Sequence, residues 1–375
     1  MRAQWQMTIW VSLLVLVALS PTQAQDNIVS LCPDTDIQIR SASFEPGGLI
    51  LTAFDSQALW VYDINRNTRY PLPGTRPCTS NCHLSPDAQW IIYLDPENYR
   101  FSKMRLNGTQ RTPLVSDASE VDWWNQDTLV IWTTDQQAYL RPEADLQAEP
   151  EPFSPSGLVS IQPDGRSALR ITGDEGQFNR VIVNLDDPTQ APIVLAEDVP
   201  YFNASAWSPD GQYLAYVQRT IEGGSELYLT RVDGTEQQQL TALSSAYGAV
   251  RINGYAPTDL SWSPDGQYLA FWVIPLTGTN PEADTDEAVL HVVALADGET
   301  RRYCHYSTRE HTPETPRIIW SPDSTHLAFA GNIPGDDKGA LLLAVDVTTG
   351  TFTELSNGMF PVYGIPQLNA WGTVP

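Results

Sequence analysis

The chain has 375 residues and a formal charge of −24, from 21 lysines and arginines against 45 aspartates and glutamates. A surface this acidic repels phosphate backbones, so nucleic acid and anionic lipid are poor partners. Hydrophobic residues make up 42% of the chain and 12 residues are tryptophan, which excludes general disorder. The 29 prolines and 24 glycines indicate short elements joined by many turns and disfavour a helical protein.

The first 24 residues are typical of a cleaved signal peptide. Arg2 gives a positive start, residues 9–19 form an apolar stretch, and Thr22-Gln23-Ala24 offers small residues at a cleavage site. The apolar stretch is too short for a membrane span, which needs about 20 residues. We therefore expect a secreted or periplasmic protein with no transmembrane span after cleavage.

Export places the four cysteines where disulfide bonds persist. We expect Cys78 and Cys82 to close a local loop, and Cys32 and Cys304 to fasten an N-terminal arm. The sequence alone does not choose among the three alternative pairings. A zinc site at Cys78 and Cys82 is disfavoured because no second ligand pair has zinc-like spacing. No metal and no other cofactor is expected.

One phrase recurs along the chain. Its clearest copies read WSPDGQYLAY from Trp207, WSPDGQYLAF from Trp262 and WSPDSTHLAF from Trp320. Degenerate copies have their anchor residues at Phe44, Leu84, Trp124 and Ile161. The seven anchors follow one another at intervals of about 40 to 60 residues, which is typical of a repeat architecture and, for β-sequences, of a β-propeller.

The Ser-Pro-Asp-Gly phrase predicts a tight turn between two strands. Proline presets φ at the first central position of the turn. Gly211 and Gly266 are then expected in the left-handed conformation that begins the return strand. The anchor before the turn ends an inner strand, and the hydrophobic residues after it form a buried second strand. A third strand and a weaker fourth strand complete a four-stranded blade.

The phrase W-S-P-D-G-x-x-[LI]-A-[YF] resembles the repeat of TolB-type β-propellers, relatives of WD-repeat propellers in bacterial envelope proteins. The resemblance covers most of residues 37–358 and implies a propeller fold and an exported binding protein. It does not imply the partners of TolB itself. The motif residues are turn and core positions, so no functional residue is carried over.

We therefore expect an all-β protein made of a single propeller of four-stranded blades. Seven blades fit the anchors best, and eight or six are the alternatives. The predicted organisation is an N-terminal arm at 25–36, the propeller at 37–358 and a C-terminal tail at 359–375. Trp371 in this tail is expected to lie in a strand that pairs near the first blade. The ring is expected to be monomeric.

Strand direction places the tight turns on one face and the remaining connections on the other. On that second face the last three blades have long connections, at 217–225, 244–258, 275–287, 300–316 and 331–339. Because function tends to lie on long loops carried by a rigid scaffold, we expect binding there. The candidate binding residues are Tyr201, Phe202, Tyr247, Arg251, Tyr255, His305, Arg309 and His311.

Two further groups in this sector have polar alternatives. The cluster around Cys304, His305 and His311 can be read as a metal or acid–base site, but a solvated polar loop is the favoured interpretation. Asp284 and Asp286 are weak calcium candidates, because their loop lacks the glycine and distal glutamate of an EF-hand. The aromatic residues suit stacking on a sugar or peptide, with packing over blade edges as the alternative.

The sequence contains no nucleophile elbow, zinc-protease motif, P-loop or dinucleotide fingerprint. We therefore expect an exported, non-catalytic propeller that binds a protein or an oligosaccharide, or acts as a scaffold, in the cell envelope or outside the cell. The alternative is a propeller lyase or hydrolase acting on an oligosaccharide at the long-loop face. Catalytic carboxylates at the channel mouth would be invisible among 45 acidic residues.

Overall fold

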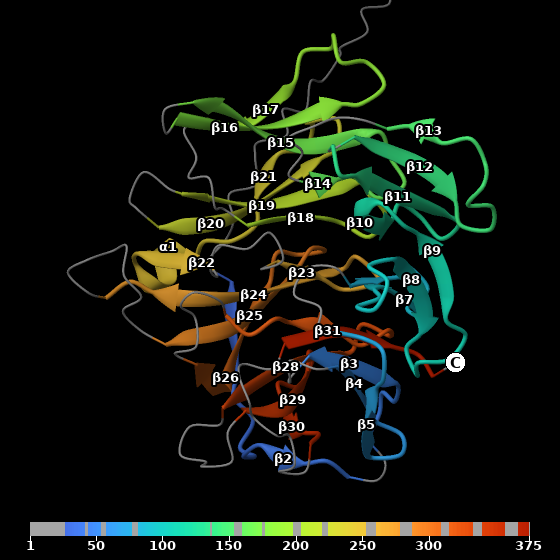
Figure 1. Ribbon diagram of the computed structural model, residues 1–375. Helices are drawn as coiled ribbons and strands as arrows, with labels where there is room; N and C mark the ends of the chain where they lie inside the picture. Colours follow the sequence, from blue (N-terminus) through green and yellow to red (C-terminus); the bar gives the residue numbers. More distant parts are fainter. Residues whose placement is uncertain are drawn as a thin grey trace, which may run out of the picture.

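The computed structural model describes residues 27–41, 44–53, 58–76, 82–135, 137–153, 160–174, 177–197, 204–219, 224–252, 260–277, 287–308, 315–332, 340–356 and 367–374. They form a seven-bladed β-propeller whose blades follow one another round the ring in chain order (Figure 1). The predicted all-β fold and the number of blades are thus confirmed. The expected signal peptide at 1–24 lies outside the described residues.

Four strands run outward from the centre of the ring in each of the first four blades. Blade 1 contains β31 (Gln367–Gly372), β3 (Leu49–Ala53), β4 (Leu59–Asp63) and β5 (Thr68–Leu72). Blade 2 contains β6 (His83–Leu84), β7 (Trp90–Leu94), β8 (Phe101–Arg105) and β9 (Thr112–Val115). Blade 3 contains β10 (Ala118–Trp123), β11 (Thr128–Thr133), β12 (Ala138–Pro142) and β13 (Glu151–Pro152). Blade 4 contains β14 (Ser160–Ile161), β15 (Ser167–Asp174), β16 (Gln177–Asn184) and β17 (Ile193–Ala196).

The last three blades carry additional elements. Blade 5 contains β18 (Ser205–Trp207), β19 (Tyr213–Arg219), β20 (Ser225–Arg231) and β21 (Gln238–Gln239), and is followed by the short helix α1 (Leu243–Tyr247). Blade 6 contains β23 (Ser261–Trp262), β24 (Tyr268–Pro275), β25 (Ala288–Ala294) and β26 (Thr300–Thr308), and β22 (Val250–Ile252) also pairs with β24. Blade 7 contains β27 (Ile319–Trp320), β28 (His326–Asn332), β29 (Ala340–Asp346) and β30 (Phe352–Glu354).

The core lies between neighbouring blades. The middle strands are almost continuously hydrophobic because each blade is covered on both faces by the blades beside it. In β24, every residue from Leu269 to Ile274 is buried. Trp272 of blade 6 and Phe329 of blade 7 meet edge to face, with ring centroids 5.2 Å apart. Such aromatic contacts add specific geometry to the burial of apolar area.

The Ser-Pro-Asp-Gly turn is held by its serine as well as by its glycine. In the turn of blade 5, the Ser208 hydroxyl donates to the Asp210 carboxylate at 2.6 Å and accepts the Tyr213 backbone N–H at 3.0 Å. The corresponding serines of blades 2, 6 and 7 do the same. Gly211 and Gly266 have φ of +67° and +69°, which confirms the predicted left-handed conformation.

Indole hydrogen bonds link the inner strands of adjacent blades. Trp320 Nε1 donates to the carbonyl oxygen of Ser261 at 2.9 Å, and Trp123 Nε1 donates to that of His83 at 3.2 Å. This bond and the strand register make Trp123 the anchor of blade 3, so the assignment of Trp124 was wrong by one residue. The turn there lacks the proline of the repeat and is correspondingly shorter.

The two ends of the described chain complete the last blades and the first. β31 occupies the inner position of blade 1 and pairs with β3, with Trp371 opposite Ile50. The expectation that Phe44 ends the inner strand of this blade was therefore wrong. In the N-terminal arm, β1 (Ile28–Leu31) adds in parallel to β26, and β2 (Gln38–Ile39) adds in parallel to β30 (Figure 1).

A disulfide bond fastens this arm. Cys32 is bonded to Cys304 of β26, with Cα atoms 5.1 Å apart, as the sequence analysis expected. Cys82 is also disulfide-bonded, while its expected partner Cys78 lies outside the described residues. Disulfides of this kind are typical of proteins that leave the cytoplasm. No helix within the described ranges is long and apolar enough to cross a membrane.

Candidate functional site

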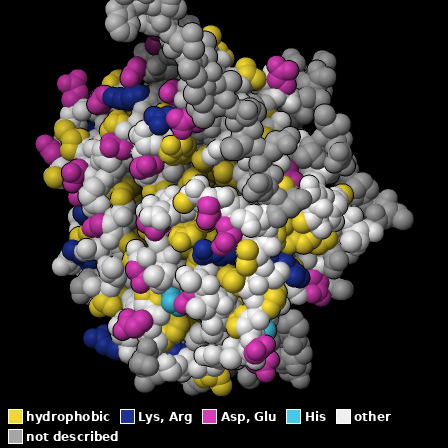
Figure 2. Space-filling view, turned by 180° about the vertical axis from the view of Figure 1, so that it is seen from behind, with side chains coloured by type: hydrophobic (Ala, Val, Ile, Leu, Met, Phe, Trp, Pro, Cys, Tyr) yellow, Lys and Arg dark blue, Asp and Glu magenta, His cyan; other side chains and the backbone are white. Residues whose placement is uncertain are grey.

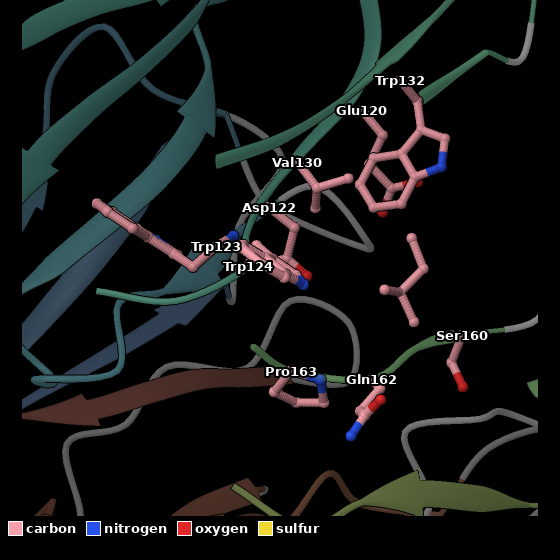
Figure 3. Close-up of a pocket in the computed structure, with 10 residues that line it drawn as sticks. Glu120, Asp122, Trp123, Trp124, Val130, Trp132, Ser160, Gln162 and Pro163 are labelled. Atoms are coloured by element: carbon pink, nitrogen blue, oxygen red, sulfur yellow. The ribbon is translucent and has the colours of Figure 1, made fainter. Parts of the chain in front are cut away.

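A cavity of about 280 Å³ lies between blades 3 and 4, at the inner edge of the ring (Figure 3). Strands β10 and β11 form one wall, and β14 with its following turn forms the other. The lining residues are Glu120, Asp122, Trp123, Trp124, Val130, Trp132, Ser160, Ile161, Gln162 and Pro163. The lining therefore combines indole rings with two carboxylates, a combination suited to holding a ligand.

Strand register explains why these side chains meet. In an antiparallel pair, residues directly opposite each other share a face, and alternate residues of one strand do so too. Glu120 lies opposite Trp132, and Asp122 lies opposite Val130. All four therefore project from one face of the β10–β11 pair, as the labelled side chains in Figure 3 show. The intervening Val121 packs instead into the cluster shared with blade 2.

His83 joins the two carboxylates from the inner strand of blade 2. Its Nδ1 lies 3.1 Å from Asp122 Oδ1, and its Nε2 lies 3.5 Å from Glu120 Oε1. Burial alone would lower the pKa of His83, but the charges of Asp122 and Glu120 outweigh it and raise this pKa to about 10. His83 is therefore an imidazolium at neutral pH.

The wall provided by blade 4 is fixed by hydrogen bonds. Ser160 Oγ accepts the indole N–H of Trp207 at 3.1 Å. The Gln162 amide donates to the carbonyl oxygen of Gly211 at 2.8 Å and accepts the Ser167 backbone N–H at 3.0 Å. Each of these contacts uses a side chain that lines the cavity, so the site is preorganised by both neighbouring blades.

The inner surface of the ring is chemically uneven. The residue just before each anchor occupies the same place on every inner strand. In blades 2, 3 and 4 this residue is His83, Asp122 or Ser160. In blades 5, 7 and 1 it is Ala206, Ile319 or Ala370, and in blade 6 it is Ser261. Charge at this position is therefore confined to blades 2 and 3.

The structure describes three of the eight candidate binding residues. The Tyr247 hydroxyl lies 3.0 Å from His291 Nε2, beside β22, which carries Arg251. The remaining ring nitrogen of His291 lies 2.9 Å from the carbonyl oxygen of Val289, so it carries the proton and Nε2 accepts from Tyr247. His305 is distant from this group in the fold, on β26, where Nε2 contacts the carbonyl oxygen of Pro33 in the arm.

The other predicted site residues lie outside the described part of the chain. They are Tyr201, Phe202, Tyr255, Arg309 and His311, together with the calcium candidates Asp284 and Asp286. Their proposed role is carried forward as a prediction. Within the described residues, no group of three His, Cys, Asp or Glu side chains is arranged to hold a metal ion.

The residues of the cavity were missed at the level of sequence. Glu120 and Asp122 do follow the two-residue period of a strand that ends at an anchor, and that period was a usable signal. Their partner His83 comes from another blade, so the cluster appears only when the inner strands are aligned. Figure 2 shows acidic side chains scattered among basic and polar ones over one side of the molecule, which gives no further guide.

Comparison with known proteins supports the repeat assignment. The Tol-Pal system protein TolB of Alcanivorax borkumensis is 34% identical over 84 residues, which is 22% of this chain and 17% of that protein. The repeat is of the TolB type. The chain thus matches less than a fifth of the length of this relative. No family model matches the chain.

Solved structures show the same fold. A puromycin-hydrolyzing peptidase of Mycobacterium tuberculosis superposes with a TM-score of 0.52 at 12% identity, covering 86% of this chain and 54% of the peptidase. TolB from Acinetobacter baumannii superposes with a TM-score of 0.43 at 14% identity, covering 86% of this chain and 82% of that one. The chain spans little more than half of the peptidase. At these identities the likeness concerns the fold alone.

Proposed function

We propose that the protein is an exported, non-catalytic β-propeller that binds a ligand or partner in the periplasm or outside the cell. The observation that carries this proposal is the state of the cavity between blades 3 and 4. Its indoles and carboxylates provide contacts for a ligand, while His83 is held as an imidazolium between Asp122 and Glu120. The TolB-type repeat and the disulfide-fastened arm support an exported binding role.

The alternative, a propeller lyase or hydrolase, needs a group that gains and loses a proton near the working pH. His83 is poorly suited to this task, because the two carboxylates raise its pKa to about 10 against the pull of burial. A binding site has no such requirement. Fixed charges and fixed indoles favour it instead, because they reduce the ordering cost of association.

The long connections of blades 5 to 7 are proposed as a second contact surface. Between the strands of these blades the chain devotes residues 276–287, 309–318 and 333–339 to connections, whereas the opposite face carries only tight turns. Removing residues 278–286 should weaken partner binding and leave the melting temperature nearly unchanged. Substituting the Asn107-Gly108 turn should do the reverse.

Native mass spectrometry of the mature protein isolated from its own compartment tests the binding role. The wild type should carry a bound molecule that Glu120→Gln loses. Glu236→Gln is the matched control, since it removes the same charge from a residue that is 61% exposed in a turn of blade 5.

The same three proteins should be offered neutral and acidic oligosaccharides between pH 5 and 9, with product detection. We expect no turnover. Turnover by the wild type that Glu120→Gln or Asp122→Asn abolishes would establish the enzyme alternative and overturn the proposed function.

A further inference from the structure

We propose that the cavity between blades 3 and 4 binds an organic cation, an ammonium or guanidinium group, between the Glu120 carboxylate and the Trp132 ring. This inference rests on the proposed binding function and names its ligand chemistry. Glu120 and Trp132 lie directly opposite each other on one face of β10 and β11 (Figure 3). Side chains of directly opposed residues lie about 5 Å apart at Cβ, so a carboxylate and an indole converge there.

The charges of the site leave one carboxylate available. His83 supplies one positive charge against the two negative charges of Asp122 and Glu120, so the triad has an excess of one negative charge. Asp122 is the more fully engaged, because Oδ1 also accepts the backbone N–H of Trp123 at 2.7 Å. Glu120 has only the longer contact with His83 and keeps 46% of its side chain exposed. It is therefore the acceptor with capacity for a ligand.

Trp132 is the aromatic partner that the ligand can reach. One ring of the lining, Trp124, already has the Arg166 guanidinium 5.5 Å from its centroid. The protein uses the same pairing elsewhere, with Lys103 Nζ 4.3 Å and Arg105 Cζ 4.0 Å from the ring of Trp90. A cation over an indole face contributes about 0.5–2 kcal/mol, depending on its solvation, and an adjacent carboxylate adds a charge-assisted hydrogen bond.

Size and overall charge narrow the ligand further. A volume of about 280 Å³ falls just below the range of about 300–1,000 Å³ for drug-sized ligands, so the cavity suits a side chain or a small amine better than an oligosaccharide. The chain carries a formal charge of −24, which attracts cations and repels acidic sugars and phosphates.

The test compares cations with neutral analogues of the same shape. The probes are n-butylamine, a capped Gly-Lys-Gly peptide, n-butanol, a capped Gly-norleucine-Gly peptide and cellobiose, each titrated calorimetrically into the mature protein at pH 7 and low salt. The two cations should bind at least 10-fold more tightly than the neutral probes, and their affinity should fall as salt is added. Tighter binding of the peptide than of butylamine would identify a partner's side chain as the source of the cation, and equal binding would identify a free amine.

Glu120→Gln should reduce cation affinity at least 10-fold, as should Trp132→Leu, while Glu236→Gln should leave it unchanged. Equal binding of cations and neutral probes, preference for cellobiose, or an unaltered affinity in Glu120→Gln would each overturn the inference. If no cation binds but the native ligand is lost from Trp132→Leu, the cation inference fails and the binding function stands. Glu120→Gln keeps the test decisive if Trp132→Leu folds poorly, because the Glu120 side chain is nearly half exposed.

Discussion

Trp262 Nε1 donates a hydrogen bond to the backbone carbonyl oxygen of Ala206, in the preceding blade, at 3.0 Å. The anchor tryptophan thus belongs to two blades at once: its backbone ends one inner strand, and its indole nitrogen satisfies a carbonyl of the next. The repeat keeps tryptophan at this place for a reason beyond size, since phenylalanine fills similar space and cannot donate.

Replacing Trp262 with phenylalanine should therefore reduce the free energy of unfolding by about 1–2 kcal/mol, because a polar group between blades loses its partner. Trp132→Phe is the control, as the Trp132 indole nitrogen has no hydrogen bond within the described residues. Urea unfolding of both variants measures the difference. Equal losses would show that ring size, and not the hydrogen bond, accounts for the tryptophan.

Gly211 and Gly266 should differ in their tolerance of alanine although their φ angles are nearly equal. At Gly266 an added Cβ has its nearest neighbour at 3.9 Å, so only the left-handed backbone opposes it, at a cost of about 1–2 kcal/mol. At Gly211 a Cβ would fall 2.3 Å from the Pro163 carbonyl oxygen of blade 4, so Gly211→Ala should cost more. Denaturant melts that rank the two variants equally would contradict this reading of the close approach.

Replacing valine for Gly266 should be more costly than replacing asparagine, because β-branched residues resist positive φ and asparagine tolerates it. Ala88 occupies the corresponding place in blade 2 with φ of +55°. Ala88→Gly should therefore be neutral or stabilising by up to about 1 kcal/mol. A clear loss of stability in Ala88→Gly would argue that this turn is held by its side chain.

The double substitution Cys32→Ser and Cys304→Ser should destabilise the protein by about 2–5 kcal/mol, since the bond closes a long loop. Its effect should be visible as faster hydrogen exchange in β1 and β2, with little change in blade 3. Titration of the unreduced, denatured wild type should detect no free thiol. Two or more free thiols would contradict the disulfide assignment.

Two histidines should give opposite pH dependences. His83 has a folded pKa of about 10 against an ordinary value of 6.5, so its ion contacts stabilise the fold fully below about pH 6.5 and are lost as the pH rises toward 10. Burial, partly offset by the Val289 carbonyl, lowers the pKa of His291 to about 4. Keeping His291 neutral therefore costs stability as the pH falls from 6.5 toward 4.

We expect His83→Gln to be more destabilising at pH 6 than at pH 10, and His291→Gln to flatten the loss of stability on the acid side. Thermal melts across pH 4 to 10 and NMR titration of both rings provide the measurements. A His83 ring that is neutral at pH 8, or a His291 ring that is charged at pH 5.5, would contradict the assigned contacts.

The blades could be predicted because their signals are local. A serine, proline, aspartate and glycine in succession form their own hydrogen bonds, so each turn announces a strand on either side. The cavity could not be predicted in the same way, because Asp122 and His83 become neighbours only through the closure of two adjacent blades. The parallel addition of β1 and β2 likewise depends on the edges of strands encoded more than 250 residues later.

The inner strand of blade 1 is the last strand of the chain, and this order has a consequence for biogenesis. Blade 1 stays incomplete until residues 367–372 have emerged, and the strands of the arm have no edge to join until β26 and β30 exist. Contacts this distant in sequence slow folding, because loop closure must precede them. A chain that crosses a membrane from its N-terminus therefore cannot close the ring during translocation. Sealing is a single late event, and loss of the final few residues should leave an open, protease-sensitive arc of blades.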